Sequence, residues 1–325
     1  MPSQHSFSQS DKNPLISFVI PAYNLPAELL RECLTHILDL SLSKDEREII
    51  IIDDGSDLPV IDDLFDYRDK FVYLRQRNQG LSVARNMGIL LATGKYIQFV
   101  DGDDYLIQAP YEHCLDIARY HDPDIVLFED TNDSNVETPF NYDGPVSGSS
   151  FMHNNNLRAS AWGYIFRKSL LINLRFTPGI LHEDEEFTPQ LILRADRLFT
   201  TNAKAYYYRK RPSSITNKSD KNHNLRRLAD TERVIFHLQE VAESIPEVDR
   251  VALQRRVAQL SMDYLYNTIL LTRSSKHLET AIDHLRDHGL FPLPDKNYTR
   301  KYNLFRKAIN SSIGRKMMII TLPRL

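Results

Sequence analysis

Short apolar runs alternate with amphipathic segments between residues 16 and 129 of the 325-residue chain. Such runs predict buried strands, and the segments between them have the 3.6-residue periodicity of helices. Strand–helix alternation implies parallel strands joined by crossovers, with helices on both faces of the sheet. We therefore expect an α/β fold with a doubly wound, mostly parallel sheet. The predicted strands are 16–20, 47–53, 70–76, 95–100 and 124–129, and the predicted helices are one that begins after Pro26, 81–92 and 109–121.

The pattern changes after residue 130. Residues 130–150 are rich in turn-forming residues and predict a loop or an irregular hairpin. A helix is expected at 182–195 and an extended segment at 198–211, and about 100 residues of helical periodicity follow. We predict a disordered tail at 1–14, an α/β domain at 15–215 and a smaller helical domain with a basic tail at 216–325.

Charge is distributed unevenly along the chain. Residues 1–215 carry 21 basic and 31 acidic side chains, whereas residues 216–325 carry 19 and 12. An acidic α/β domain argues against a nucleic-acid partner, because phosphate backbones require a basic surface. No run approaches the roughly 20 apolar residues that span a bilayer, and the first 15 residues have no signal-peptide core, so we expect a cytoplasmic protein. The two cysteines, Cys33 and Cys114, are expected to be buried thiols.

Three of the predicted strands lead into the segments 21–24, 53–56 and 101–104, and the last two of these segments contain five aspartates. In an open parallel sheet, ligands bind beyond the carboxyl ends of the strands. Several carboxylates at one edge repel each other unless a cation or a set of donors compensates them. Hard oxygen ligands favour magnesium or manganese, with further ligands from substrate phosphates. An Asp-Gly pair after one strand is also a common turn signal, so the prediction depends on the segments together.

The chain resembles the family 2 glycosyltransferases, an inverting group with the GT-A fold. The resemblance extends over about residues 15–211 and recurs in the family's order. It is carried by the segments Val19-Ile20-Pro21-Ala22-Tyr23-Asn24, Ile51-Ile52-Asp53-Asp54-Gly55-Ser56, 78–88 (NQGLSVARNMG), Phe99-Val100-Asp101-Gly102-Asp103-Asp104 and His182-Glu183-Asp184-Glu185.

The resemblance implies a nucleotide-sugar site at the strand ends. Tyr23 is similar to the aromatic that stacks on the nucleobase, between Pro21 and Asn24, and Asp54 to the acid that hydrogen-bonds the base. Arg85 and Asn86, on the predicted helix 81–92, could reach donor phosphates or sugar hydroxyls.

The second acidic segment resembles the metal motif of the family. Asp101 is expected near the ribose and Asp103 on a metal that bridges the diphosphate, with Asp104 as an adjacent candidate ligand. The resemblance thus implies a divalent cation, Mn or Mg, and a nucleotide-sugar donor, most simply a UDP-sugar.

Asp184, beside Glu183, matches the general base of the family. Inverting sugar transfer is a direct displacement in which the acceptor hydroxyl loses a proton to a carboxylate. The alternative reading of residues 183–186 is a solvated acidic first turn, which the helix dipole also favours.

Five further residues are weaker candidates for acceptor or phosphate contacts, and one of them is Glu183, beside Asp184. Trp162 suits a sugar face or the protein core equally. Arg209 and Arg211 could touch phosphate or could end a solvated strand, and His182 could touch donor phosphate or be structural.

We therefore expect an inverting glycosyltransferase that acts on a glycan or lipid-linked glycan in polysaccharide or cell-envelope synthesis. The basic, apolar segment 296–325 would suit contact with an anionic membrane, at the inner face of the cell membrane, or packing within its own domain. The alternatives are a nucleotidyltransferase-like enzyme and a catalytically inactive nucleotide-sugar-binding protein. A dinucleotide oxidoreductase is excluded because the turn after the first strand has no glycine.

Overall fold

The computed structural model describes residues 13–133, 135, 138–210 and 220–322. It contains two compact units, each built from several chain segments. The first unit comprises Met1–Asp143, Trp162–Ile172 and Thr200–Arg209, and the second comprises Gly144–Ala161, Asn173–Phe199 and Lys210–Leu325. The predicted tail at 1–14 falls almost entirely outside the described residues, as does the predicted domain boundary near residue 216. The division into domains at 15–215 and 216–325 stays a prediction.

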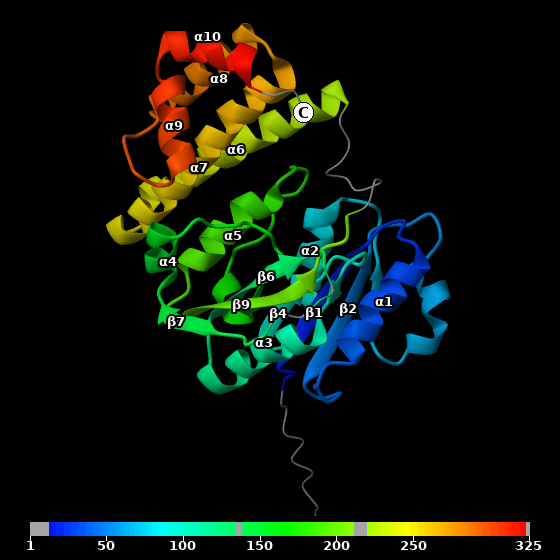
Figure 1. The fold of residues 1–325 in the computed structure, drawn as a ribbon. Coiled ribbons are helices and arrows are strands. Elements are labelled where there is room, and N and C mark those ends of the chain that lie inside the picture. Colours follow the sequence, from blue (N-terminus) through cyan, green and yellow to red (C-terminus); the bar gives the residue numbers. More distant parts are fainter. Residues whose placement is uncertain (1–12, 134, 136–137, 211–219, 323–325) are drawn as a thin grey trace, which may run out of the picture. The chain divides into compact units, whose positions relative to one another are not determined.

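The described residues form one nine-stranded sheet (Figure 1). Its order is β3-β2-β1-β4-β8-β6-β9-β5, and β7 pairs with β9. The strands are β1 Ile16–Ala22, β2 Arg47–Asp53, β3 Val72–Arg75, β4 Tyr96–Phe99, β5 Tyr105–Leu106, β6 Ile125–Thr131, β7 Tyr142–Val146, β8 Tyr164–Arg167 and β9 Leu198–Tyr207.

Strands β3, β2, β1 and β4 are parallel, which confirms the predicted core of the α/β fold. Ala22 pairs with Asp53 in register, so β1 and β2 end at the same edge. Strand β8 was not predicted, and it runs antiparallel to both of its neighbours, β4 and β6. Strand β7 lies within 130–150, where a loop or an irregular hairpin was expected.

Helices cover both faces of this parallel core. Successive residues of a strand point to opposite faces. Phe18 of β1 packs against Tyr111 of α3 (Gln108–His121), with ring centroids 6.0 Å apart. The next residue, Val19, packs against Gly88 of α2 (Leu81–Leu91), where a Cβ atom would lie only 2.1 Å from Val19 Cγ1. The absence of a side chain at Gly88 thus lets α2 approach the sheet closely.

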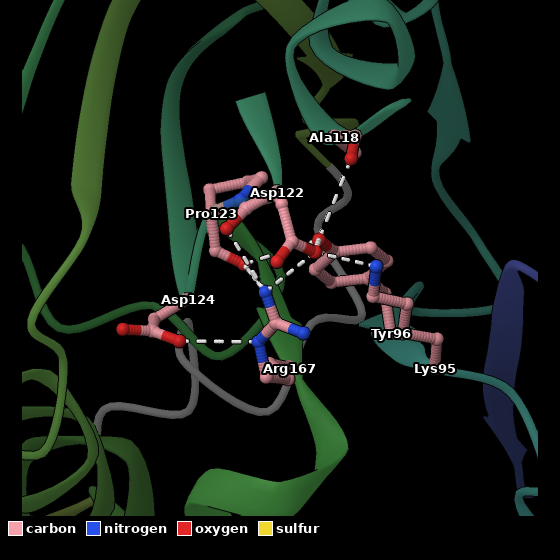
Figure 2. A network of polar contacts seen from close by, with 7 residues as sticks. All are labelled: Lys95, Tyr96, Ala118, Asp122, Pro123, Asp124 and Arg167. Carbon is pink, nitrogen blue, oxygen red and sulfur yellow. Dashed lines mark hydrogen bonds and ion pairs between the residues drawn. The ribbon is translucent and has the colours of Figure 1, made fainter. Parts of the chain in front are cut away.

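A polar network fastens β8 to the end of α3 (Figure 2). The guanidinium of Arg167 pairs with Asp122 at 2.8 Å and with Asp124 at 3.1 Å, and it donates to the backbone carbonyls of Asp122 and Pro123. Lys95 also pairs with Asp122, and together these two cations lower the pKa of that carboxyl to about 2. The network holds the antiparallel strand in the sheet at the edge opposite the predicted site.

Helical structure dominates the second unit, as the periodicity of the sequence predicted. No helix among the described residues is long and apolar enough to cross a bilayer.

The remaining helical elements of the described chain, in both units, are α1 Ala27–Leu38, η1 Val60–Tyr67, α4 Gly148–Asn154, η2 Lys168–Leu171, α5 Glu183–Leu193, α6 Lys221–Ser244, α7 Glu247–Thr272, α8 Ser275–Asp287, α9 Arg300–Ile309 and α10 Ser312–Thr321. Cys33 on α1 and Cys114 on α3 are buried free thiols, as expected.

The end of β9 supports the turn that follows β4. The hydroxyl of Tyr206 accepts a hydrogen bond from the Asp101 amide and donates one to Asp104 Oδ2, both at 3.0 Å. The backbone amide of Arg209 donates to Asp104 Oδ1 at 2.7 Å, and its Nε donates to the Asp103 carbonyl at 2.9 Å. These contacts fix the backbone of the acidic turn at residues 101–104.

We expect Tyr206→Phe to lower the free energy of unfolding by about 1–3 kcal/mol, because it leaves the buried carboxyl group of Asp104 with an unpaired oxygen. Tyr207→Phe is the matched control, since the Tyr207 ring stacks on Tyr105 at 4.4 Å and phenylalanine keeps that ring. Urea unfolding of the two variants measures the difference. An equal loss of stability in both variants would contradict the assigned role of the Tyr206 hydroxyl.

Candidate functional site

The loops that follow β1 and β2 are joined by a reciprocal pair of side-chain contacts. Asn24 Nδ2 donates to the Asp57 carboxylate at 3.2 Å, and Asn24 Oδ1 accepts from the Asp57 amide at 2.8 Å. The Asn24 amide also donates to Ser56 Oγ at 2.9 Å. Asn24 has a φ of 46°, a left-handed conformation that asparagine tolerates well. Asn24 therefore holds the loops after β1 and β2 together at the strand ends.

Tyr23 directly precedes Asn24 in the chain, and 50% of its surface is exposed. Pro21, two residues earlier, is buried in β1 and pairs in register with Ile52. An exposed aromatic side chain on a rigid strand end offers a flat apolar face to a ligand ring. This is the environment that the predicted stacking role of Tyr23 requires.

Asp53 is a structural residue of the turn after β2. Its buried carboxylate accepts hydrogen bonds from Tyr73 Oη at 2.7 Å and from the Ser56 amide at 2.8 Å. Burial alone would raise the pKa of Asp53, but these hydrogen bonds outweigh it and lower the pKa. Arg75 Nε also pairs with Asp53 Oδ2 at 3.4 Å, so Asp53 stays ionised inside the protein.

Asp54 is also buried, and it holds the loop that leads into α2. Its carboxylate accepts from Gln76 Nε2 at 2.7 Å, the Gln79 amide at 3.0 Å and the Gly80 amide at 2.8 Å. Gly55 follows with a φ of 78°, and a Cβ atom there would lie 2.7 Å from the Asn78 amide nitrogen. A carboxylate has about four lone-pair sites, so these donors leave Asp54 capacity for roughly one more. The predicted contact between Asp54 and a nucleobase stays a prediction.

Arg85 lies in the second turn of α2 and points toward the end of β4. Its Nη2 pairs with Asp101 Oδ1 at 3.0 Å, and only 4% of its side chain is exposed, against 26% for Asp101. Asn86 is half-buried on the same helix. The ion pair places a buried guanidinium beside Asp101, which is predicted to lie near the donor ribose.

The three acids after β4 occupy different environments. Asp104 is buried, and its two oxygens are held by Tyr206 and by the Arg209 amide. Burial, together with the negative charge of Asp101, raises the pKa of Asp104 to about 8. Asp101 and Asp103 are both half-buried. Of the candidate metal ligands, Asp104 is therefore buried, whereas Asp101 and Asp103 keep accessible surface beside their contacts within the protein.

A divalent cation fits this pair of acids if it takes its other ligands from a bound diphosphate. No group of three or more His, Cys, Asp or Glu side chains within the described ranges could hold a metal ion by itself. One or two carboxylates with phosphate oxygens is a usual ligand set for Mg²⁺. Hard carboxylate oxygens suit Mn²⁺ as well.

Arg209 anchors the acidic turn to α1 in the structure. Besides its bonds to the acidic turn, its Nη2 pairs with Glu32 at 2.7 Å. This guanidinium is bonded within the protein and is not simply a solvated strand end, and its predicted contact with phosphate stays a prediction. Arg211 lies outside the described residues.

Trp162 is buried in the first unit, with only 7% of its surface exposed. Its ring stacks on Tyr206 at 4.3 Å, and its carbonyl accepts from Gln98 Nε2 at 2.8 Å. These contacts favour the core role over the acceptor role that was also considered. Trp162 supports the ring whose hydroxyl holds the turn at 101–104.

The acidic first turn of α5 belongs to the second unit, and it is not simply solvated. Glu185 pairs with Arg256 of α7, and Glu186 pairs with His237 of α6. Burial would raise the pKa of Glu186, but hydrogen bonds with His237 and Thr177 and the nearby positive charges together lower it. Glu183 is buried and Asp184 is half-buried. The interpretation of residues 183–186 as a solvated turn is therefore wrong for at least Glu185 and Glu186.

His182 precedes this turn with a φ of 65°. Burial and the neighbouring Arg227 lower the pKa of His182, so the imidazole is neutral near pH 7. A neutral ring can donate one hydrogen bond but adds no positive charge for a phosphate.

The first unit thus gathers Tyr23, Asp54, Arg85, Asp101 and Asp103 around the carboxyl ends of the neighbouring strands β2, β1 and β4. His182, Glu183 and Asp184 belong to the second unit. The functional roles of all these residues stay predictions.

Sequence reasoning missed two residues that shape the site, Tyr206 and Gln76. Tyr206 lies in a run of three tyrosines that was interpreted only as extended. Strand alternation could have indicated that the middle and outer rings face opposite sides. Gln76 carries no local signal, because its partner Asp54 is 22 residues away in the sequence.

Comparison with known proteins identifies the family. Residues 17–168 match the family model described as "Glycosyl transferase family 2". The chain is 31% identical over 220 residues to EpsJ, an uncharacterized glycosyltransferase of Bacillus subtilis strain 168, which covers 62% of this chain and 63% of EpsJ. It is also 31% identical over 223 residues to the glycosyltransferase GlyG of Streptococcus pneumoniae serotype 4, which covers 62% of this chain and 72% of GlyG. The match thus spans less than two thirds of EpsJ.

The fold is also shared with a solved structure, S. aureus TarS residues 1–349 in complex with UDP-GlcNAc. That structure superimposes with a TM-score of 0.66 over 93% of this chain and 92% of the TarS chain, at 18% sequence identity. The likeness shows a common GT-A architecture. Taken with the strand-end motifs and the sequence matches, it means that this chain belongs to glycosyl transferase family 2.

Proposed function

We propose that this protein is an inverting glycosyltransferase that moves a sugar from a nucleoside-diphosphate donor to a hydroxyl acceptor. The observation that carries the proposal is the grouping of an exposed aromatic ring, a buried guanidinium and two accessible carboxylates at the carboxyl ends of β1, β2 and β4. Ligands bind at this edge in open α/β sheets. The grouping contains both an apolar face for a base and charged groups for a diphosphate.

The donor would bind in the first unit. Tyr23, flanked by Pro21 and Asn24, would stack on the nucleobase, and Asp54 would accept a hydrogen bond from it. Arg85 and Asn86 would orient the phosphates or the sugar, with Arg85 already held by Asp101. A UDP-sugar is the donor we favour, and the complex of the structural neighbour TarS with UDP-GlcNAc supports this choice.

Asp101 and Asp103 would hold a divalent cation, Mn²⁺ or Mg²⁺, with Asp101 nearer the ribose. When bound, such an ion neutralises the charge that develops on the departing diphosphate. Asp104 would support the other two acids through the backbone, since Tyr206 and Arg209 hold its carboxylate.

Asp184 would accept the proton of the attacking hydroxyl. A general base must lie within hydrogen-bond distance of that proton, and it must be ionised at the working pH. Asp184 lies in the first turn of α5, where its Oδ1 accepts a hydrogen bond from the Glu185 amide at 2.9 Å. Glu183 and the neutral His182 would contact the acceptor or the donor phosphate beside it.

The acceptor would be a glycan or a lipid-linked glycan of polysaccharide or cell-envelope synthesis, used on the cytoplasmic side of the membrane. The two alternatives are a nucleotidyltransferase-like reaction and a protein that binds nucleotide sugars without turnover. Products distinguish them. Sugar transfer or donor hydrolysis releases a nucleoside diphosphate, nucleotidyl transfer releases pyrophosphate, and a binding protein releases neither.

A panel of UDP- and GDP-sugars with Mn²⁺ or Mg²⁺ tests the proposal. We expect metal-dependent release of UDP from at least one UDP-sugar. Asp184→Asn should lower the rate of transfer by about 100- to 10,000-fold while UDP affinity stays unchanged, because the base acts on the acceptor. Asp103→Asn should instead weaken both UDP affinity in the presence of metal and the rate.

The control is Asp287→Asn, which alters an exposed carboxylate at the end of α8. It should leave both quantities unchanged. The assignment of the base fails if Asp184→Asn retains full activity. The enzyme proposal fails if tight UDP-sugar binding is never accompanied by turnover of any donor.

We further propose that α9 and α10 contact an anionic membrane surface. Ile313, Met317 and Ile320 are 71%, 59% and 81% exposed, and their spacing places them on one side of α10 with Lys316. Arg306 and Arg315 pair with Asp295 and Glu279, which reduces the positive charge of the segment 296–325. An apolar stripe beside a basic side chain, here Lys316, is a pattern found in interfacial helices.

Co-sedimentation at low salt measures this contact. The intact protein should pellet with phosphatidylglycerol vesicles and stay in solution with phosphatidylcholine vesicles, since each Lys or Arg near an anionic surface contributes about 1 kcal/mol. The double variant Ile313→Ser, Met317→Ser should lose most of the binding, whereas Leu90→Ser, at a 69% exposed leucine on α2, should retain it. Absence of the intact protein from the anionic pellet would refute the membrane contact.

A further inference from the structure

The helix that carries the proposed base is fastened to α6 and α7 by the acids next to that base. Asp184 lies in the first turn of α5, and the following two residues, Glu185 and Glu186, each pair with a cation or imidazole from another helix. Arg256 of α7 donates to Glu185, and His237 of α6 contacts Glu186. Two consecutive side chains of one turn therefore connect it to two different helices.

The contact between Arg256 and Glu185 is partly buried. Only 9% of the Arg256 side chain is exposed, against 26% for Glu185. The other Nη atom of Arg256 donates to the Leu157 carbonyl at 3.0 Å. A planar guanidinium that bonds two fixed acceptors defines direction as well as distance. Arg256 therefore fixes the first turn of α5 relative to α7 and to the loop at residue 157.

The chain just before α5 is held by α6. The Leu181 amide donates to Asp230 Oδ2 at 3.0 Å, and Arg226 Nη2 donates to the Gly179 carbonyl at 3.0 Å. Arg226 and Asp230 also form an ion pair at 3.6 Å. Contacts from α6 thus precede Asp184 in the sequence, and contacts from α6 and α7 follow it.

We infer that Arg256 is a positioning residue for the proposed base: through Glu185 it sets the orientation of the first turn of α5 and hence the direction of the Asp184 carboxylate. The inference rests on the proposed function and assigns α7 a part in it. Asp184 and Glu185 are adjacent in the chain, so a movement of one moves the other. A displacement of about 1 Å at a reacting group can cost on the order of 100-fold in rate.

Arg256→Gln and Arg256→Lys test this role, with donor turnover measured per mole of folded protein. We expect Arg256→Gln to lower kcat by about 10- to 100-fold while KM for the donor changes less than twofold, because the donor groups belong to the first unit. Arg256→Lys keeps the charge and should restore part of kcat. A residue with only a structural role would change the folded fraction and leave kcat per folded molecule at the wild-type value.

Arg255→Gln is the matched control on the same helix. Arg255 bonds the His153 carbonyl and Asn156, and neither residue is in α5. Its kcat should equal that of the wild type. Glu185→Gln provides a second route if Arg256→Gln does not fold, since it removes the charge and keeps the acceptor. It should also lower kcat at unchanged donor KM.

The outcomes separate the inference from the proposed function. Wild-type kcat in both Glu185→Gln and the folded Arg256 variants, with a large loss in Asp184→Asn, overturns the role of Arg256 and leaves the base in place. Full activity in Asp184→Asn overturns the base assignment itself, whatever the Arg256 variants show.

Discussion

Repulsion between carboxylates at the ends of β2 and β4 is the constraint on which the rest of the site depends. The protein compensates most of these acids with its own donors. Asp53 and Asp54 are satisfied by the turn and the loop around them, and Asp104 is held by Tyr206 and Arg209. Asp101, which pairs with Arg85, and Asp103 keep accessible surface, so a ligand can still reach their carboxylates. The buried acids therefore shape the strand ends, and the accessible ones select what binds there.

The same principle operates in the first turn of α5. Four consecutive acids would repel each other in water, but Glu185 and Glu186 are compensated by Arg256 and His237. The helices of the second unit thereby do more than pack against each other, because they stabilise the turn that carries Asp184. In both units, acids that are bonded within the protein hold in place a neighbouring acid that we propose to act on the substrate or the metal.

The sequence predicted the parallel core, the acidic segments at the strand ends and the family, because these depend on local patterns of period two or 3.6 and on contiguous motifs. It could not separate Asp103 from Asp104, which are adjacent and chemically identical. Their difference arises from Tyr206, which is 102 residues away from Asp104. Strand β8 was missed because it is four residues long and lies among mixed aromatic and basic residues. The partners of Glu185 and Glu186 were missed for the same reason as Tyr206, since ion pairs between distant helices leave no local pattern.

A crystal structure of the protein with UDP and Mn²⁺, with anomalous scattering at the manganese edge, tests the central claim most directly. The account predicts one manganese peak bonded to Asp103 and to the diphosphate, with the uracil ring against Tyr23 and Asp104 still bonded to Tyr206. A nucleotide bound away from the ends of β1, β2 and β4, or a manganese peak without a carboxylate from residues 101–104, would contradict it.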